Sequence, residues 1–175
     1  MKSVLISIQP KWCELIASGK KTVEVRKTRP KLETPFKVYI YQTIDGGAKY
    51  DRIVSSGLIC GKVIGEFVCD QIIDIPYSQY FVDYYHTMPQ EDLEATCLDM
   101  GHIDEYLLSK NGYGWHISDL VIYDKPRELS EFKKPCTHKN DCFTCDRYDY
   151  IGHRCYDDIT RPFQSWGYVE SEEQK

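Results

Sequence analysis

The chain has 175 residues, of which 42% are hydrophobic and 28% charged, and its formal net charge is −5. This size and composition suit one globular domain that can bury a core without disulfides. The negative balance excludes a protein coated in positive charge, although it allows a local basic cleft. No run approaches the roughly 20 apolar residues of a membrane span, and no signal segment follows Met1. We therefore expect a cytoplasmic protein whose eight cysteines are reduced unless they bind metal.

The first 30 residues predict a strand, a short helix and a second strand. Residues 4–9 are mostly apolar and predict a strand. Pro10 suits the first helical turn, and Gly19 suits the position just past a helix end. Residues 18–27 then follow as a charged strand, so the helix is a short link between two strands.

The charged strand alternates polar and apolar side chains with the period of a half-buried strand. Thr22, Glu24 and Arg26 should share one face, with Lys21 at the entrance of the strand and two valines facing a core. Residues 20–31 are also locally basic. This face predicts a recognition patch, and the alternative is a solvated strand face that carries a cross-strand ion pair.

The segment from Ile8 to Arg26 resembles the start of the ASCH domain, a branch of the PUA-like superfamily. In that family an Ile-x-Pro helix leads into Gly-x-Lys-Thr-x-Glu-x-Arg. Residues 61–67, 115–119 and 161–166 match the family more loosely. The resemblance implies an α+β fold, namely a small, mostly antiparallel PUA-like β-barrel with flanking helices. It also implies a ligand cleft beside the charged strand.

The middle of the chain predicts further strands and two helices. Residues 36–43 form a strand, residues 44–56 a mobile loop, and residues 58–75 one long bent strand with Gly61 and Gly65 as bulge or close-approach points. A tyrosine-rich segment begins at residue 76. Helices are expected from residues 88 and 102, and strands at 115–117, 120–123 and 166–169, the last beside the first strand.

Four cysteines lie within 20 residues near the end of the chain. The C-x-x-C pair lets one turn offer two thiolates to one ion, and four thiolates would form a closed structural zinc site. His138 or His153 could replace one of them; an unmetallated loop and redox or iron–sulfur chemistry are the alternatives. The predicted zinc ligands are Cys136, Cys142, Cys145 and Cys155. We expect a single domain over residues 1–170, with 135–156 as a cysteine-rich insertion and 171–175 as a disordered tail.

By position, the resemblance implies that the cleft is lined by Lys21, Thr22, Glu24 and Arg26. Lys21 and Arg26 suit a phosphate or a polarised carbonyl, and Glu24 could accept from a base amino group or act as a general base. Trp115 could stack a base or pack in the core. His116 lies beside it on the same strand, as a further ligand contact or as an ordinary histidine.

Three functions remain open from the sequence. The first is binding of RNA or of a modified nucleoside or nucleotide in this cleft, for which replacing Arg26 by alanine should leave folding intact and weaken binding. The second is hydrolysis of nucleosides or RNA there, as an amidohydrolase or a ribonuclease. The amidohydrolase branch that this start resembles carries a threonine nucleophile at the position of Glu24, which argues against that activity. The third is a protein-partner module that uses the zinc loop.

Overall fold

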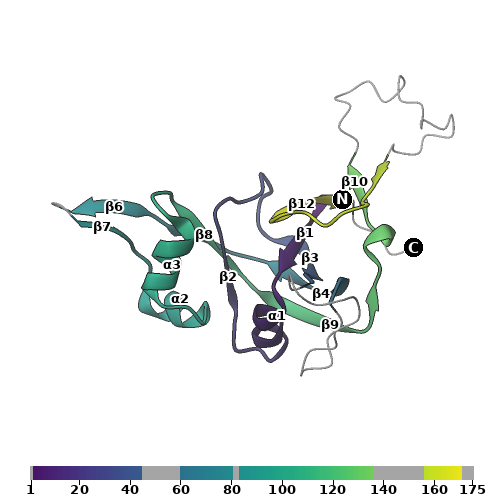
Figure 1. The fold of residues 1–175 in the computed structure, drawn as a ribbon, viewed down its shortest axis with the longest axis horizontal. Coiled ribbons are helices and arrows are strands. Elements are labelled where there is room, and N and C mark those ends of the chain that lie inside the picture. Colours follow the sequence, from purple (N-terminus) through teal and green to yellow (C-terminus); the bar gives the residue numbers. More distant parts are fainter. Residues whose placement is uncertain (1, 45–59, 81–82, 136–155, 171–175) are drawn as a thin grey trace, which may run out of the picture.

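The computed structural model describes residues 2–44, 60–80, 83–135 and 156–170 (Figure 1). Its largest sheet has five strands, in the spatial order β12-β1-β3-β4-β9. Their bounds are Trp166–Glu170 for β12, Lys2–Ile8 for β1, Phe36–Gln42 for β3, Lys62–Cys69 for β4 and Ser118–Arg127 for β9. Only the β1–β3 pair in this sheet is parallel. The expected closing strand thus lies beside the first strand, as predicted.

A second sheet of three antiparallel strands carries the charged segment. Its order is β2 (Val23–Arg26), β8 (Gly112–His116) and β5 (Ile72–Ile75). The hairpin of β6 (Tyr77–Tyr80) and β7 (Asp83–His86) leads to α2 (Gln90–Ala95) and α3 (Met100–Leu107). Figure 1 shows the hairpin and these helices at the opposite end of the molecule from β12. A 3-10 turn (Leu129–Glu131) precedes the two-stranded ribbon of β10 (Lys133–Pro135) and β11 (Tyr156–Asp158).

The main core lies between the two sheets and the first helix. Ile6, Ile40 and Phe67 come from the five-stranded sheet, Ile16 from α1 (Pro10–Ala17) and Trp115 from β8. All five side chains are fully or almost fully buried. Burial of one such aliphatic side chain contributes about 1.5–3 kcal/mol to stability. The short helix therefore docks on the core through one face, where Cys13 and Ile16 are buried.

The end of α1 fixes where the charged strand begins. Gly19 has a φ of +73°, a conformation that costs glycine little. Its N–H donates to Ile16 O, and the Lys20 N–H donates to Leu15 O. These two bonds are the Schellman arrangement that ends helices at glycine. The chain reverses there and enters β2, which confirms the predicted strand–helix–strand order.

The long strand predicted over residues 58–75 is wrong in one respect. The chain breaks at Asp70 and Gln71 into β4 and β5, which belong to different sheets. Gly65 is a close-approach point, as predicted, because a Cβ there would lie 2.4 Å from Val121 O on β9. At this break the chain passes from the five-stranded sheet to the three-stranded sheet.

The fold is mixed α+β and mostly antiparallel, as predicted, but the barrel is not seen. The strands that the structure describes form open sheets, and none of these sheets closes on itself. The predicted loop at 44–56 lies almost wholly outside the described residues. In the described part of the chain, no helix is long and apolar enough to span a membrane.

The four predicted zinc ligands also lie outside the described residues. The strands on either side of them pair with each other, with Pro135 opposite Tyr156. The cysteine-rich segment therefore leaves and rejoins the domain at one point. This arrangement suits an insertion, while the insertion itself and its zinc remain predictions.

A buried histidine links the hairpin to α3. His86 is 3% exposed. Its Nδ1 lies 2.5 Å from Asp104 Oδ1, and its Nε2 lies 2.9 Å from Lys110 O. We predict that His86→Ala lowers the free energy of unfolding by about 2–3 kcal/mol, because it removes one hydrogen bond to a carboxylate and one to a backbone carbonyl. Urea denaturation checks this, and a change no larger than that of His102→Ala, at an exposed histidine on α3, would contradict it.

Candidate functional site

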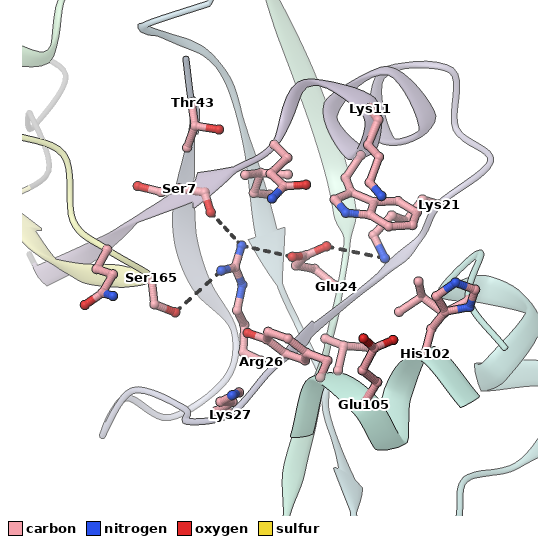
Figure 2. Close-up of a pocket in the computed structure, with 17 residues that line it drawn as sticks. Ser7, Lys11, Lys21, Glu24, Arg26, Lys27, Thr43, His102, Glu105 and Ser165 are labelled. Carbon is pink, nitrogen blue, oxygen red and sulfur yellow. Dashed lines mark hydrogen bonds and ion pairs between the residues drawn. The ribbon is translucent and has the colours of Figure 1, made fainter. Parts of the chain in front are cut away.

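A cavity of about 790 Å³ opens where the first strand, the first helix and α3 meet β2 (Figure 2). Its walls come from five segments of the chain, namely residues 7–12, 21–27, 43, 98–106 and 164–165. The lining residues used below are Ser7, Lys11, Trp12, Lys21, Glu24, Arg26, Lys27, His102, Glu105, Tyr106 and Ser165. The charged strand forms its floor, so the cleft expected beside residues 20–29 is present.

Three buried charges occupy this floor. Glu24 Oε2 lies 3.3 Å from Lys21 Nζ, and Glu24 Oε1 lies 2.9 Å from Arg26 Nη2. Figure 2 shows the carboxylate between the two cations. Lys21 is 2%, Glu24 6% and Arg26 7% exposed. Burial of charges is expensive unless they are paired and hydrogen-bonded, and here each one is paired.

The two cations also hold the backbone around them. Lys21 Nζ donates to Thr96 O at 2.7 Å, next to the end of α2. Arg26 Nη2 donates to Ser7 O on β1 at 2.8 Å, and Nη1 donates to Ser165 Oγ at 3.5 Å. The charge cluster therefore ties β2 to β1, to α2 and to the segment before β12.

One donor of this cluster has no partner. Arg26 Nε is buried and makes no hydrogen bond with any group in the described part of the chain. A buried donor without a partner costs about 1–3 kcal/mol, and such groups are rare in folded proteins. Arg26 lines the cavity, so this unsatisfied N–H lies at the cavity wall, and a ligand acceptor that reached it would satisfy it.

Two aromatic rings border the cavity. Lys11 Nζ lies 4.4 Å and Lys21 Nζ 5.3 Å from the ring centre of Trp12. Lys27 Nζ lies 4.9 Å from the ring centre of Tyr106. Burial raises the pKa of Tyr106 above its ordinary value, and the charge of Arg26 and a side-chain hydrogen bond with Arg26 oppose this shift. Lysines thus lie over the faces of both rings, and a flat ligand that stacks there would replace a cation–π contact.

The cavity is more basic than the chain as a whole. Lysines 11, 21 and 27 and Arg26 line it with four positive charges, against the two negative charges of Glu24 and Glu105. His102 lies beside them. The chain carries −5 overall, so the positive excess is local. It favours an anionic ligand or one with an anionic group.

The structure brings together three of the six predicted ligand residues. Lys21, Glu24 and Arg26 line the cavity, whereas Thr22, Trp115 and His116 are not among its lining residues. The backbone of Thr22 is paired, through bonds to Ala95 O and from the Ile117 N–H. Because Thr22 does not line the cavity, it does not provide a threonine nucleophile there.

Trp115 is a core residue in this structure. It is 0% exposed, and its ring lies 5.8 Å from that of Phe36 and 5.7 Å from that of Trp166. It is the cross-strand partner of Glu24 in the pairing of β2 with β8. This was the alternative interpretation of Trp115.

His116 pairs with Val23 and so faces away from Glu24. Its Nδ1 lies 2.6 Å from Asp70 Oδ1. This hydrogen bond is the main cause that lowers the pKa of Asp70 below its ordinary value. His116 thus forms a half-exposed pair with Asp70 outside the cavity.

The charged strand is more buried than its sequence predicts. All four residues of β2 are buried, the charged ones included. The polar face is covered because β1, α3 and the segment before β12 pack around it. Sequence reasoning also missed Lys11, Trp12, Tyr106 and Ser165 as site residues, since only the tertiary fold brings them to the strand.

These features define a small α+β domain with a buried charge cluster at the base of a basic cavity. The family model of the ASCH domain matches residues 6–97, more than half of the chain. The chain therefore belongs to the ASCH domain family, whose PUA-like fold is generally linked to RNA binding.

Solved structures agree with this assignment at the level of the fold. The crystal structure of ASCH from Zymomonas mobilis has 18% sequence identity and a TM-score of 0.56, covering 97% of this chain and 89% of that one. Two point mutants of the same protein match with 18% and 19% identity and TM-scores of 0.56 and 0.55. They cover 98% and 97% of this chain, and 93% and 89% of theirs. No curated protein matches the chain.

The bonds of Arg26 change what its replacement should do. Arg26→Ala would leave Glu24 with one cation and Ser7 O without its donor. We predict a loss of about 3–5 kcal/mol in the free energy of unfolding, as for other broken buried ion pairs, in place of the intact folding expected from the sequence. Urea denaturation measures it, with Lys27→Ala as the exposed control expected to change stability by less than about 0.5 kcal/mol. A loss below 1 kcal/mol for Arg26→Ala would show that the cluster is not structural.

Proposed function

We propose that this ASCH domain binds RNA, or a nucleoside or nucleotide with or without a modified base, in the cavity above β2. The observation that carries the proposal is the buried Arg26, whose Nε has no partner in the described residues. The Glu24 carboxylate lies beside the Arg26 guanidinium, with Glu24 Oε1 2.9 Å from Arg26 Nη2. A donor and an acceptor fixed side by side match the polar edge of a nucleobase.

The rest of the cavity supports the same kind of ligand. Trp12 and Tyr106 provide stacking faces for a base, and Lys11 and Lys27 provide exposed charges for a phosphate. The cavity volume of about 790 Å³ falls in the usual range of small-molecule sites, about 300–1,000 Å³. The link of PUA-like domains to RNA binding agrees with this chemistry.

Hydrolysis in the same cavity is the alternative function. Both oxygens of Glu24 are held by cations, and the position of the amidohydrolase branch's threonine nucleophile is occupied by this carboxylate. These contacts suit recognition better than attack on a substrate. Binding is therefore the proposal, and recovery of the bound ligand in altered form would revise it.

Exposed cavity lysines allow the binding site to be tested without breaking the fold. We predict that Lys11→Gln and Lys27→Gln each weaken saturable binding of nucleoside monophosphates or short single-stranded RNA about 5- to 20-fold, because each removes one charge near the phosphate. Isothermal titration calorimetry measures the dissociation constants. Lys125→Gln, an exposed lysine on β9, is the matched control.

Two results would overturn the proposal. Binding that both cavity variants leave unchanged would place the ligand elsewhere. No saturable binding of nucleosides, nucleotides or RNA by the unmodified protein would favour the protein-partner alternative, in which the cysteine-rich segment is the interaction surface.

A structural zinc ion in the cysteine-rich segment is part of the proposal. The chemistry of the donors supports it, since four thiolates would form a closed tetrahedral site, with His138 or His153 as a substitute ligand. The pairing of Pro135 with Tyr156 provides a fixed base for such a loop. A closed site has no open position for a substrate, so the zinc would stabilise the segment.

We predict that the purified protein holds one zinc ion per chain and that Cys142→Ser with Cys145→Ser releases it, because two of four thiolates are lost. Inductively coupled plasma mass spectrometry measures the metal content. Cys13→Ser with Cys69→Ser, at two core cysteines, should retain the metal if the variant folds. Full zinc content after loss of Cys142 and Cys145 would refute the site.

A further inference from the structure

A second cavity lies next to the end of the charged strand. Its volume is about 890 Å³, and residues 29–34 and 70–72 line it. The chain that leaves β2 connects the two cavities, because Lys27 lines the first and Arg29 and Lys31 line the second. The connection of residues 27–31 therefore runs directly from one cavity to the other.

This connection is basic, and all of its residues except Pro30 are exposed. Lys27, Arg29 and Lys31 are exposed, and no acidic residue lies between them. The Arg29 guanidinium lies 5.4 Å from the ring centre of Tyr113. In the second cavity Glu33 and Asp70 are acidic, and Asp70 is held by His116 at 2.6 Å. The positive charge is thus concentrated on the connection itself.

The connection is also fastened to the fold. Trp166 Nε1 donates to Thr28 Oγ1 at 3.0 Å, and the Lys31 N–H donates to Tyr168 Oη at 2.7 Å. Both partners belong to β12. The backbone that carries the three cations is therefore held in place before any ligand arrives. A preorganised row of charges binds with a smaller loss of conformational entropy.

The geometry points to single-stranded RNA of a few nucleotides as the ligand, with one base in the first cavity and the backbone following residues 27–31 toward the second. This inference rests on the proposed function and specifies its ligand. A row of cations without acids matches the repeating charge of a phosphate backbone. A base can enter the first cavity only when it is unpaired, which excludes an intact duplex.

The length of the connection sets the length of the ligand. Four residue steps span at most about 14 Å, which corresponds to about four nucleotides at the roughly 3.4 Å per phosphate of a stacked strand. Affinity should therefore rise from a monophosphate to an oligomer of four or five nucleotides. Longer strands should gain little more.

The test compares a nucleoside monophosphate with RNA of two, three, five and eight nucleotides by titration at several salt concentrations. We expect the pentamer to bind at least 10-fold more tightly than the monophosphate. The double variant Arg29→Gln, Lys31→Gln should keep the monophosphate affinity and lose most of the gain with length. Its salt slope for the pentamer should fall by about 1.4, because each phosphate contact on a single strand contributes about 0.7.

The control is Lys110→Gln with Lys125→Gln, which removes two exposed charges outside the connection and should preserve the gain with length. Saturable monophosphate binding without tighter binding of the pentamer would refute the RNA path and leave the proposed function standing. A gain with length that survives loss of Arg29 and Lys31 would also refute the path. No binding of either ligand would overturn both.

Discussion

The ion pairs of Glu24 with Lys21 and Arg26 are the interaction on which the site depends. Each cation also binds a backbone carbonyl outside β2, Ser7 O for Arg26 and Thr96 O for Lys21. Three charges that would be expensive to bury singly become a link between β1, β2 and the end of α2. The cluster therefore shapes the cavity and helps to hold the elements that form its walls.

The same cluster leaves one hydrogen-bond donor unsatisfied, and a ligand could provide its acceptor. Arg26 uses both terminal nitrogens for protein groups, and its Nε remains without a partner in the described residues. A ligand acceptor at this N–H would remove an unfavourable term already present in the free protein. Trp12 and Tyr106 stand at the cavity wall, so polar recognition and stacking can act on one base. The basic connection after β2 extends this site toward the second cavity.

The sequence predicts those parts of the site that lie on one continuous segment. Pro10, Gly19 and the alternation in β2 are local signals, and they identify the strand–helix–strand unit with Lys21, Glu24 and Arg26. Parts set by distant contacts are not readable in this way. A tryptophan on a strand suits a stacking surface as well as a core, and only the packing of Trp115 against Phe36 and Trp166 decides between them. The break after β4 cannot be predicted from the sequence either, because apolar residues continue on both sides of Asp70.

The most direct test of the account follows the Nε–H resonance of Arg26 by NMR while a nucleoside monophosphate or pentameric RNA is added to ¹⁵N-labelled protein. The account predicts a saturating change at this resonance, with the same dissociation constant as calorimetry, because the ligand supplies the missing acceptor. Saturable binding that leaves the Arg26 Nε–H resonance unchanged would contradict it. The open donor would then be a feature of the fold, and the ligand would bind at another surface.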